Sequence, residues 1–483
     1  MRSLLPARRI QLNASRRISA ITSRTIPVTA AVLAGGLLAT GGAMPADAAP
    51  AVPKANTTVE HGTLQAAGES VSPDAVADAV GAPSPASSGQ LAPSTESMPT
   101  GPVTAGAKPG TLVAVTPDGQ KLPCATPGNP YGGAKTTPVF IRPGVTVRKY
   151  TKSGRTPMYV TSANLAGSGT KVRPGPLTRG AVTNLTTLRS KASGKHAYVA
   201  TNGDFFHLGQ DGSPYGAEVT RGGTVIKGIS KAQTSLILQR DRTATIGTVR
   251  LTIPIKARKG TVHGQAWNSD YLPRDGIAVF TSSWGAGARK YLRPSQQLRE
   301  FVVSGHKVVH VYKHITNVGI PKNGYIIEAQ GRAVNRLRAI GVRRGAAVAA
   351  GKFLHTSAPH GVDTAIGVGM ALVHKSRYQG PVCSQDNAVA RTIVGIMPGG
   401  KRMFVAVVQG QTDSAHHNFT GLTARESTAL AYHMGAAEAV MFDGGGSAGV
   451  ISTGAYGKIT QYTKSADNWD RLIPNGYAFW RRS

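Results

Sequence analysis

Residues 390–408 read ARTIVGIMPGGKRMFVAVV, two apolar runs separated by a proline and two glycines. The pattern predicts a strand over Arg391 to Met397, a turn at Pro398-Gly399-Gly400 and a returning strand over Arg402 to Val408, which together form a hairpin. Side chains alternate between the faces of a strand. Arg391, Ile393 and Gly395 are therefore expected on one face, and Thr392, Val394 and Ile396 on the other.

Similar short apolar runs, separated by Gly, Pro and Asn, recur from residue 111 onward and predict a strand-dominated chain. Helical pattern is sparse and is clearest at Val182 to Lys191 and at Ala333 to Ile340. Without regular alternation of strands and helices, the predicted fold class is α+β, a strand-rich mixed or antiparallel sheet core with a few packing helices. The further candidate strands are 144–150, 157–163, 196–201, 234–239, 245–253, 277–281, 301–304, 307–311 and 325–328.

Residues 1–48 are predicted to be an export signal, because several arginines precede an apolar run from Ile26 to Met44 and the small-residue site Ala46-Asp47-Ala48. The run contains four glycines, and no second apolar stretch approaches the length of a membrane span. We therefore expect a secreted, extracellular protein without a stable membrane anchor. Ser15-Arg16-Arg17 partly matches a twin-arginine signal, so both that route and Sec export stay open.

Residues 49–110 are rich in Ala, Pro and Ser and contain no aromatic residue, so they are predicted to be a disordered spacer. Residues 111–483 are predicted to be the catalytic domain, of which 111–200 could form a β-rich subdomain. The whole chain carries 55 Lys and Arg against 23 Asp and Glu, a net charge of +32. This excess predicts either a polyanionic partner or a basic surface that serves solubility, and no nucleic-acid motif accompanies it.

Cys124 and Cys383 are the chain's two cysteines. In an exported protein they are expected to form a disulfide, since oxidising compartments favour pairing. Two buried free thiols are the alternative.

Ala439 to Phe442 is predicted as a buried strand that leads into Asp443-Gly444-Gly445-Gly446-Ser447. Consecutive backbone amides in such a loop can form an anion-binding nest, and Asp443 could act in catalysis. A tight turn in which the aspartate caps its own backbone is the alternative. Residues 445–449 also fit the serine-hydrolase motif, but 450–454 indicate a strand and turn where that motif requires a helix, and no histidine follows.

Thr423-Ala424-Arg425-Glu426 opens a helical run that closes at Gly435. The spacing predicts a capping box, in which Thr423 caps the helix and Glu426 reaches back to it. Glu426 is a catalytic candidate for which this capping role is the structural alternative.

A second polar cluster is Asn202-Gly203-Asp204, which follows a predicted strand and precedes two phenylalanines. Gly203 would let Asn202 and Asp204 point toward one pocket, although such a segment alone is also a turn signal. A third polar segment, Gly410-Gln411-Thr412, follows the hairpin.

Together these segments resemble the phosphodiester glycosidase family. The resemblance implies hydrolysis of a sugar-1-phosphodiester at the anomeric C–O bond, which yields free sugar and a phosphomonoester. No cofactor or metal is expected, and a metal site shared by the adjacent His416 and His417 is not favoured. The predicted catalytic residues are Asp443, Asp204, Arg391 and Glu426; the predicted substrate-binding residues are Asn202, Thr392, Gln411, Gly444, Gly445, Gly446 and Ser447.

Arg391 is expected to clamp phosphate oxygens, assisted by the glycine amides. Asp443 or Asp204 would stabilise the oxocarbenium-like carbon or position water. The expected partner is a sugar-1-phosphodiester, such as a phosphate-bearing wall glycan. The alternative function is a noncatalytic binding module for anionic cell-wall or capsule polymer, which would bind in a salt-sensitive way without releasing sugar.

Overall fold

The computed structural model describes residues 112–115, 121–124, 127–166, 172–289, 297–380, 388–413, 418–463 and 470–481, and does not describe the side chains of 112–115, 121–124, 411–413 and 418–420. Contacts divide the chain into Met1–Glu69 and Ser70–Ser483, and every described residue lies in the second unit. The predicted signal peptide, the predicted spacer and the Cys124–Cys383 bridge fall outside the described atoms and stay predictions.

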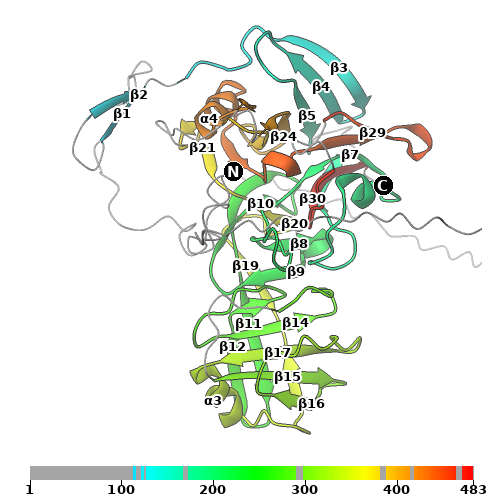
Figure 1. Cartoon of the computed structure of the whole chain (residues 1–483), viewed down its shortest axis with the longest axis vertical. Helices are drawn as coiled ribbons and strands as arrows, with labels where there is room; N and C mark the ends of the chain where they lie inside the picture. Colours follow the sequence, from blue (N-terminus) through cyan, green and yellow to red (C-terminus); the bar gives the residue numbers. More distant parts are fainter. Residues whose placement is uncertain are drawn as a thin grey trace, which may run out of the picture. The chain divides into compact units, whose positions relative to one another are not determined.

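Two sheets form the part of the unit that carries the polar clusters (Figure 1). An eight-stranded antiparallel sheet has the order β22-β21-β27-β23-β24-β5-β4-β3, and a five-stranded sheet has the order β29-β28-β7-β30-β6. The first comprises β3 (Lys135–Arg142), β4 (Val145–Thr151), β5 (Met158–Asn164), β21 (Ala371–His374), β22 (Arg377–Tyr378), β23 (Arg391–Ile396), β24 (Arg402–Val408) and β27 (Glu438–Met441). The second comprises β6 (Val172–Leu177), β7 (Ala197–Asn202), β28 (Val450–Thr453), β29 (Ile459–Gln461) and β30 (Gly476–Arg481).

A third, thirteen-stranded sheet continues from them through β11, which pairs with β10 near its start and with β12 near its end. β13 and β14 run parallel, so this sheet is mixed. It comprises β8 (Glu218–Thr220), β9 (Thr224–Ile229), β10 (Gln233–Leu238), β11 (Ala244–Ala257), β12 (Gly260–Gly264), β13 (Ala266–Trp267), β14 (Ile277–Thr281), β15 (Leu298–Ser304), β16 (Lys307–Tyr312), β17 (Gly324–Gln330), β18 (Val348–Ala350), β19 (Phe353–Thr356) and β20 (Thr364–Gly367).

The described helices are short and pack on the sheets. They are α2 (Leu188–Ala192), α3 (Arg332–Ala339) and α4 (Ala424–His433), with single 3-10 turns η2 (Arg221–Gly223), η3 (Gly445–Ser447) and η4 (Ala455–Gly457). Two small hairpins complete the described elements: β1 (Leu112–Val115) with β2 (Lys121–Cys124), and β25 (Gln411–Asp413) with β26 (Asn418–Thr420).

The predicted helix over residues 182–191 is wrong in its first half. Val182 is buried, and its amide donates to the Ser283 carbonyl at 2.8 Å, so tertiary contacts hold this segment in a loop. The helix begins only after Thr187, whose hydroxyl accepts the Ser190 amide. This N-cap sets the start of α2.

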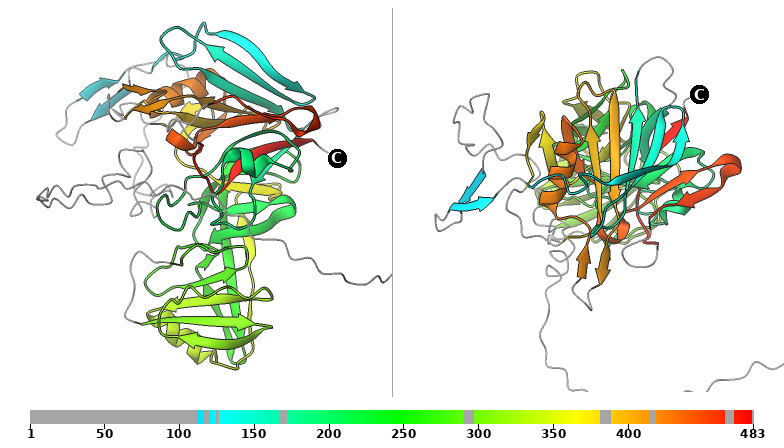
Figure 2. Two further views of the ribbon diagram at one scale, coloured as in Figure 1. Left: turned by 45° about the vertical axis from the view of Figure 1, so that its right-hand side comes forward. Right: turned by 90° about the horizontal axis from the view of Figure 1, so that it is seen from above.

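Apolar side chains between the eight- and five-stranded sheets form one core, to which β23 contributes Val394 and Ile396 and β30 contributes Tyr477 and Phe479. On the other face of the eight-stranded sheet, Ile393 packs with Leu430 of α4 in a second core. Figure 2 shows α4 beside the strands of this sheet. A helix, a sheet and a second sheet therefore lie in successive layers.

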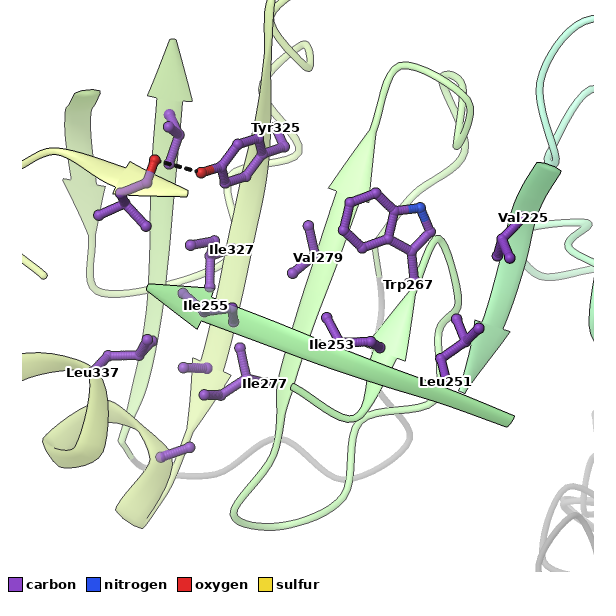
Figure 3. Close-up of a cluster of buried hydrophobic side chains, with 14 of the residues drawn as sticks. Val225, Leu251, Ile253, Ile255, Trp267, Ile277, Val279, Tyr325, Ile327 and Leu337 are labelled. Atoms are coloured by element: carbon purple, nitrogen blue, oxygen red, sulfur yellow. Dashed lines mark hydrogen bonds between the residues drawn. The ribbon is translucent and has the colours of Figure 1, made fainter. Parts of the chain in front are cut away.

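The largest apolar cluster belongs to the thirteen-stranded sheet and includes Ile253 and Ile255 of β11 and Leu337 of α3. Figure 3 shows β11 crossing the strands that carry Ile277, Val279 and Ile327. The Tyr325 hydroxyl donates to the Val348 carbonyl at 2.8 Å, so the polar end of this buried ring is satisfied.

The structure confirms the α+β class and each of the predicted strands between residues 144 and 328, with boundaries displaced by at most a few residues. β11 is longer than the predicted strand 245–253, because it continues to Ala257 and pairs there with β12. No helix among the described residues is long and apolar enough to cross a membrane.

Candidate active site

Asn202, at the end of β7, joins the polar segments that the sequence analysis singled out. Its Nδ2 donates to the Asp443 carbonyl at 2.7 Å, and its Oδ1 accepts the Thr392 hydroxyl at 2.7 Å and the Gly449 amide at 3.2 Å. The Asp443 amide donates to the Gly203 carbonyl at 3.0 Å. Segments about 190 and 240 residues apart in the sequence therefore meet at one place.

Asn202 and Thr392 are both 0 % exposed. Their polar atoms join protein segments to one another. Both oxygen lone pairs of the Asn202 amide are occupied. These two residues therefore help to position the Asp443 backbone, and their substrate-binding role stays a prediction.

The alternation predicted for β23 is confirmed. Ile393 faces the core beneath α4, whereas Val394 and Ile396 face the core between the sheets. Thr392 shares the second face and reaches Asn202 of the opposite sheet. Arg391 projects on the first face, where its Nε donates to the Leu422 carbonyl at 3.0 Å beside the start of α4.

The Arg391 side chain runs alongside the triple-glycine turn. A Cβ placed on Gly444 would lie 3.8 Å from the Arg391 Cδ and 2.7 Å from the Ala390 carbonyl oxygen. A contact of 2.7 Å to backbone is too close for a real Cβ, so only glycine fits there. The absence of a side chain at Gly444 thus allows β23 and the turn to approach.

The amides of Gly444 and Gly445 are satisfied within the protein. The Gly444 amide donates to Oδ1 of the preceding residue, Asp443, at 2.9 Å. The Gly445 amide donates to the Ala390 carbonyl at 2.8 Å. Gly445 has a φ of +53°, a conformation that favours glycine. The predicted anion-binding nest is therefore not formed by these two amides, because the turn uses them to hold Asp443 and β23. The tight-turn alternative describes them better.

Ser447, at the end of this turn, has a buried hydroxyl without a hydrogen-bond partner among the described residues. A cavity of about 20 Å³ lies against residues 446–449 and is lined further by Arg189 and Arg471. That volume accommodates about one water molecule. Ser447 therefore offers an unused donor and acceptor at the turn, as a substrate-binding residue requires.

Asp204 lies near enough to Asp443 to be affected by its charge, and it is 3 % exposed. Burial raises its pKa to about 7, and the nearby Asp443 charge adds to this, against the opposing effects of the Gly216 amide and Lys227. Oδ2 accepts the Gly216 amide at 2.7 Å. A Cβ on Gly367 would lie 2.2 Å from the same oxygen, so a glycine there is required for the carboxyl to fit. Near neutral pH this group can both hold and release a proton.

Lys227, in β9, is a buried cation that the sequence analysis did not select. Its Nζ donates to the carbonyls of Tyr215 and Gly216 at 3.2 and 3.3 Å, which holds the peptide that binds Asp204. Burial lowers the pKa of Lys227, whereas the charges of Asp270 and Asp204 oppose the effect. The signal for Lys227 in the sequence was a lysine within the largely apolar segment Thr224–Ile229.

His207, directly after the two phenylalanines, extends the cluster. Its Nε2 lies 2.9 Å from Asp270 Oδ2, and its ring meets Tyr215 edge to face at 4.4 Å. The pKa of Asp270 is lowered: burial raises it, but the hydrogen bond and charge of His207 and the charge of Lys227 outweigh burial. The closeness of His207 in sequence to Asn202-Gly203-Asp204 could have identified it as a site residue. No local sequence feature identifies Asp270.

Asn475, the residue before β30, binds the Asp204 segment. Its Oδ1 accepts the Asp204 amide at 3.0 Å, and its Nδ2 donates to Glu218 Oε2 at 3.0 Å. Asn475 is 1 % exposed. This amide orients the loop that carries Asp204.

The capping box at Glu426 is confirmed. The Glu426 amide donates to the Thr423 hydroxyl at 3.0 Å, and Glu426 Oε2 accepts the Thr423 amide at 3.1 Å. Glu426 Oε1 also pairs with Arg155 at 2.7 Å. These contacts give Glu426 a structural role, and its catalytic role stays a prediction.

The predicted segment around Gln411 lies close to the site by its backbone. β25, which contains Gln411, is in contact with the glycine turn η3. The Gln411 side chain and the His416 and His417 residues lie outside the described atoms. Among the described residues, no group of three or more His, Cys, Asp or Glu is arranged to hold a metal ion.

Residues 298–480 match the family model for phosphodiester glycosidases. This range contains Arg391 and Asp443, whereas Asn202 and Asp204 precede it. The match confirms the resemblance stated from the sequence. A search of curated proteins gives no match.

Solved structures with a similar fold include a hypothetical protein from Synechocystis, with a TM-score of 0.55 and 20 % identity over 70 % of this chain and 62 % of that one. The chain therefore spans less than two thirds of that relative. A protein from Burkholderia pseudomallei K96243 gives a TM-score of 0.52 and 15 % identity over 69 % of this chain and 74 % of that one. The catalytic domain of zebrafish N-acetylglucosamine-1-phosphodiester α-N-acetylglucosaminidase gives a TM-score of 0.34 and 13 % identity, over 72 % of this chain and 88 % of that one.

Proposed function

On the premise that residues 298–480 belong to the phosphodiester glycosidase family, we propose that this protein is an exported hydrolase that cleaves a sugar-1-phosphodiester into free sugar and a phosphomonoester. The observation that carries the proposal is the meeting of β23, the Asp443 turn and the Asn202–Asp204 loop through direct hydrogen bonds. These segments bring a guanidinium and two carboxyl groups to one end of the layered sheets.

The two carboxyl groups differ in environment, which suits two roles. Asp443 is partly exposed, whereas Asp204 is enclosed and has a pKa raised to about 7 by burial. Asp443 is the group that would stabilise positive charge at the anomeric carbon or orient water. Asp204 would hold a proton behind it, because its neutral form is populated at neutral pH.

Arg391 would contact the phosphate. Its Nε is fixed by the Leu422 carbonyl, so the plane of the guanidinium is set before the substrate arrives. The departing phosphomonoester is a good leaving group, and charge stabilisation is therefore the larger demand on the protein. In the reaction, a water oxygen bonds to the anomeric carbon while the C–O bond to phosphate breaks. The phosphate keeps the bonding electrons, and the proton lost by water passes to the solvent or to a carboxylate.

The test is release of reducing sugar from a synthetic GlcNAc-1-phosphodiester by the full chain. Arg391→Ala and Asp443→Asn should each lower kcat/KM by about 10²-fold or more while the variants stay folded. Arg402→Ala is the matched control, because Arg402 is exposed at the far end of the same hairpin. Wild-type rates in the Arg391 or Asp443 variant would refute the assignment.

The same assay separates hydrolysis from simple binding. Salt-sensitive retention of an anionic glycan without any sugar release would favour the noncatalytic binding module. Equal rates on neutral glycosides would contradict a role for phosphate in recognition. The +32 charge of the chain is the reason to include phosphate-bearing wall glycans among the substrates.

A further inference from the structure

We propose that the protein has a second binding site for phosphate groups, in an arginine-lined cavity remote from Asp204 and Asp443. The cavity has a volume of about 200 Å³ and lies where the three large sheets approach one another. Its charged lining is Arg173 of β6, Arg240 and Arg242 of the turn between β10 and β11, and Asp363 before β20. The site does not depend on the proposed hydrolysis.

The cavity carries an excess of positive charge. Asp363 is its carboxylate, and Arg173 engages both oxygens of that group, with Nε at 2.9 Å from Oδ2. The Gly222 amide also donates to Asp363 Oδ1 at 3.0 Å. The guanidinium groups of Arg240 and Arg242 make no hydrogen bond or ion pair with any other described residue. Three guanidinium groups thus face one carboxylate that is already neutralised, and two positive charges remain for a ligand.

The turn that presents Arg240 and Arg242 is rigid. The Gln239 amide donates to the Thr243 carbonyl and the Arg242 amide to the Gln239 carbonyl, at 2.8 and 2.9 Å. Asp241 Oδ1 accepts both the Thr243 amide and its hydroxyl, at 2.9 and 2.7 Å. The other oxygen of Asp241 lies 3.5 Å from His360 Nε2. Asp241 therefore stabilises the turn and does not line the cavity.

Arg242 occupies a strained backbone conformation. Its φ is +73°, which costs energy for a residue with a side chain and is adopted far more readily by glycine. Strain of this kind is concentrated at positions where function requires it. A long cationic side chain at the one position of this turn that favours glycine is consistent with a binding role.

The rest of the lining suits a ligand with an apolar body. Leu165, Val172 and Leu238 are 2 to 3 % exposed and form the base of the cavity. Arginine pairs well with phosphate because its planar fork matches two phosphate oxygens. In a phosphate-bearing glycan, the phosphate would meet the arginines and the C–H face of a sugar ring would pack on these apolar residues.

The cavity is separate from the candidate active site. β20 begins next to Asp363 and ends at Gly367, which lies against the Asp204 carboxyl. Four residues of extended chain span about 13 Å. A polymer with repeated phosphates could be held here without occupying the reaction centre.

The test measures binding of inorganic polyphosphate to the full chain at a fixed salt concentration, with polygalacturonate as the carboxylate probe. Arg240→Gln/Arg242→Gln should weaken polyphosphate binding by about tenfold or more relative to Arg343→Gln/Arg344→Gln, which removes two exposed arginines from the far end of the large sheet. Equal loss in the two double variants would show that surface charge in general binds the polymer, and would overturn the proposal. Equal affinity of the wild-type protein for polyphosphate and polygalacturonate would also overturn the proposal.

Two further measurements separate binding from folding and from catalysis. Arg242→Gly removes the guanidinium but suits the positive φ, so binding should fall without a decrease in Tm. Arg240→Gln/Arg242→Gln should hydrolyse a small synthetic sugar-1-phosphodiester at the wild-type rate. A loss of that activity would place the cavity within the reaction centre and contradict a second site. If no variant hydrolyses the diester, the proposed function fails while the binding result still decides this inference.

Discussion

At the scale of single residues, the site depends on differences in burial between similar groups. Asp443 is partly exposed, whereas Asp204 is 3 % exposed and surrounded by glycines that leave it room. Burial disfavours an ionised carboxyl group, so the pKa of Asp204 is raised to about 7. Two aspartates in glycine-rich loops thereby acquire different properties.

Asp204→Asn is expected to lower kcat/KM by about 10²-fold or more, because asparagine cannot exchange a proton. It should also change the pH dependence of stability. The folded pKa lies above the unfolded value of 3.8, so the folded state binds more protons, and this group lowers stability as pH rises from about 4 to about 7. The Tm of the variant relative to wild type should therefore increase over that interval and then level off. A Tm difference that is constant with pH would contradict the raised pKa.

Lys227→Met is expected to move the pH profile of activity. Lys227 lowers the pKa of Asp204 through its charge, so its removal should raise that pKa. Where the protonated form is the active one, the decline of kcat/KM at alkaline pH should shift to higher pH. The measurement is kcat/KM against pH on a synthetic diester. A lower rate with an unchanged profile would indicate that Lys227 serves only to hold the peptide of Tyr215 and Gly216.

At the scale of elements, local sequence signals and tertiary contacts coincide at α4. Thr423 and Glu426 form the capping box, and Gly435 has a φ of +79° after the last turn. The Gly435 amide donates to the Tyr432 carbonyl and the Ala436 amide to the Ala431 carbonyl, which is a Schellman cap. Leu422, just before the helix, accepts from Arg391. The start of α4 therefore supports the position of the guanidinium.

Thr423→Ala is expected to destabilise the protein by about 1 kcal/mol, because the Glu426 amide loses its acceptor at the helix start. KM for the diester should rise as Arg391 loses its support through Leu422. Thr423→Ser retains the hydroxyl and is the matched control. Denaturant unfolding and steady-state kinetics of the three proteins measure the two effects. Equal stability of the alanine and serine variants would show that the cap contributes little.

At the scale of the whole described unit, the sheets contain buried charges far from the candidate site. Arg289 is 3 % exposed and binds Glu328 Oε1 at 2.8 Å and Glu300 Oε2 at 3.1 Å, both from the large sheet. Burial raises the pKa of Glu328 to about 8, although Arg289 opposes the rise. One guanidinium thus compensates two buried carboxyl groups, of which Glu328 is largely protonated at neutral pH.

Arg289→Met is expected to destabilise the protein by about 3–5 kcal/mol, since it leaves two buried carboxyl groups without their partner. Relative to wild type, the stability of Glu328→Gln should increase as pH rises from about 4.5 to about 8 and then level off. Its folded pKa exceeds the unfolded 4.5, so ionisation costs stability as pH rises toward 8, and glutamine avoids that cost. Thermal unfolding from pH 6 to 9 tests both. Destabilisation by Glu328→Gln that grows with pH would contradict the assignment.

Elements whose signals are local could be predicted from the amino-acid sequence. The β23–β24 hairpin follows from two apolar runs around Pro398-Gly399-Gly400, and α4 follows from its capping residues, because turn and cap preferences act within a few residues. The same local signals also identified Asp204, Arg391 and Asp443 as candidates. They were misleading at residues 182–187, where an apolar pattern suggested helix.

The surroundings of each polar group, in contrast, follow from how the sheets pack. Asn202 and Thr392 became positioning residues because Asn202 meets partners from two distant segments. The amides of Gly444 and Gly445 were used within the protein, and Lys227, His207 and Asp270 joined the site, because sheet packing placed them around Asp204. Burial and long-range hydrogen bonds depend on which strands pack together, and no short stretch of sequence contains that information.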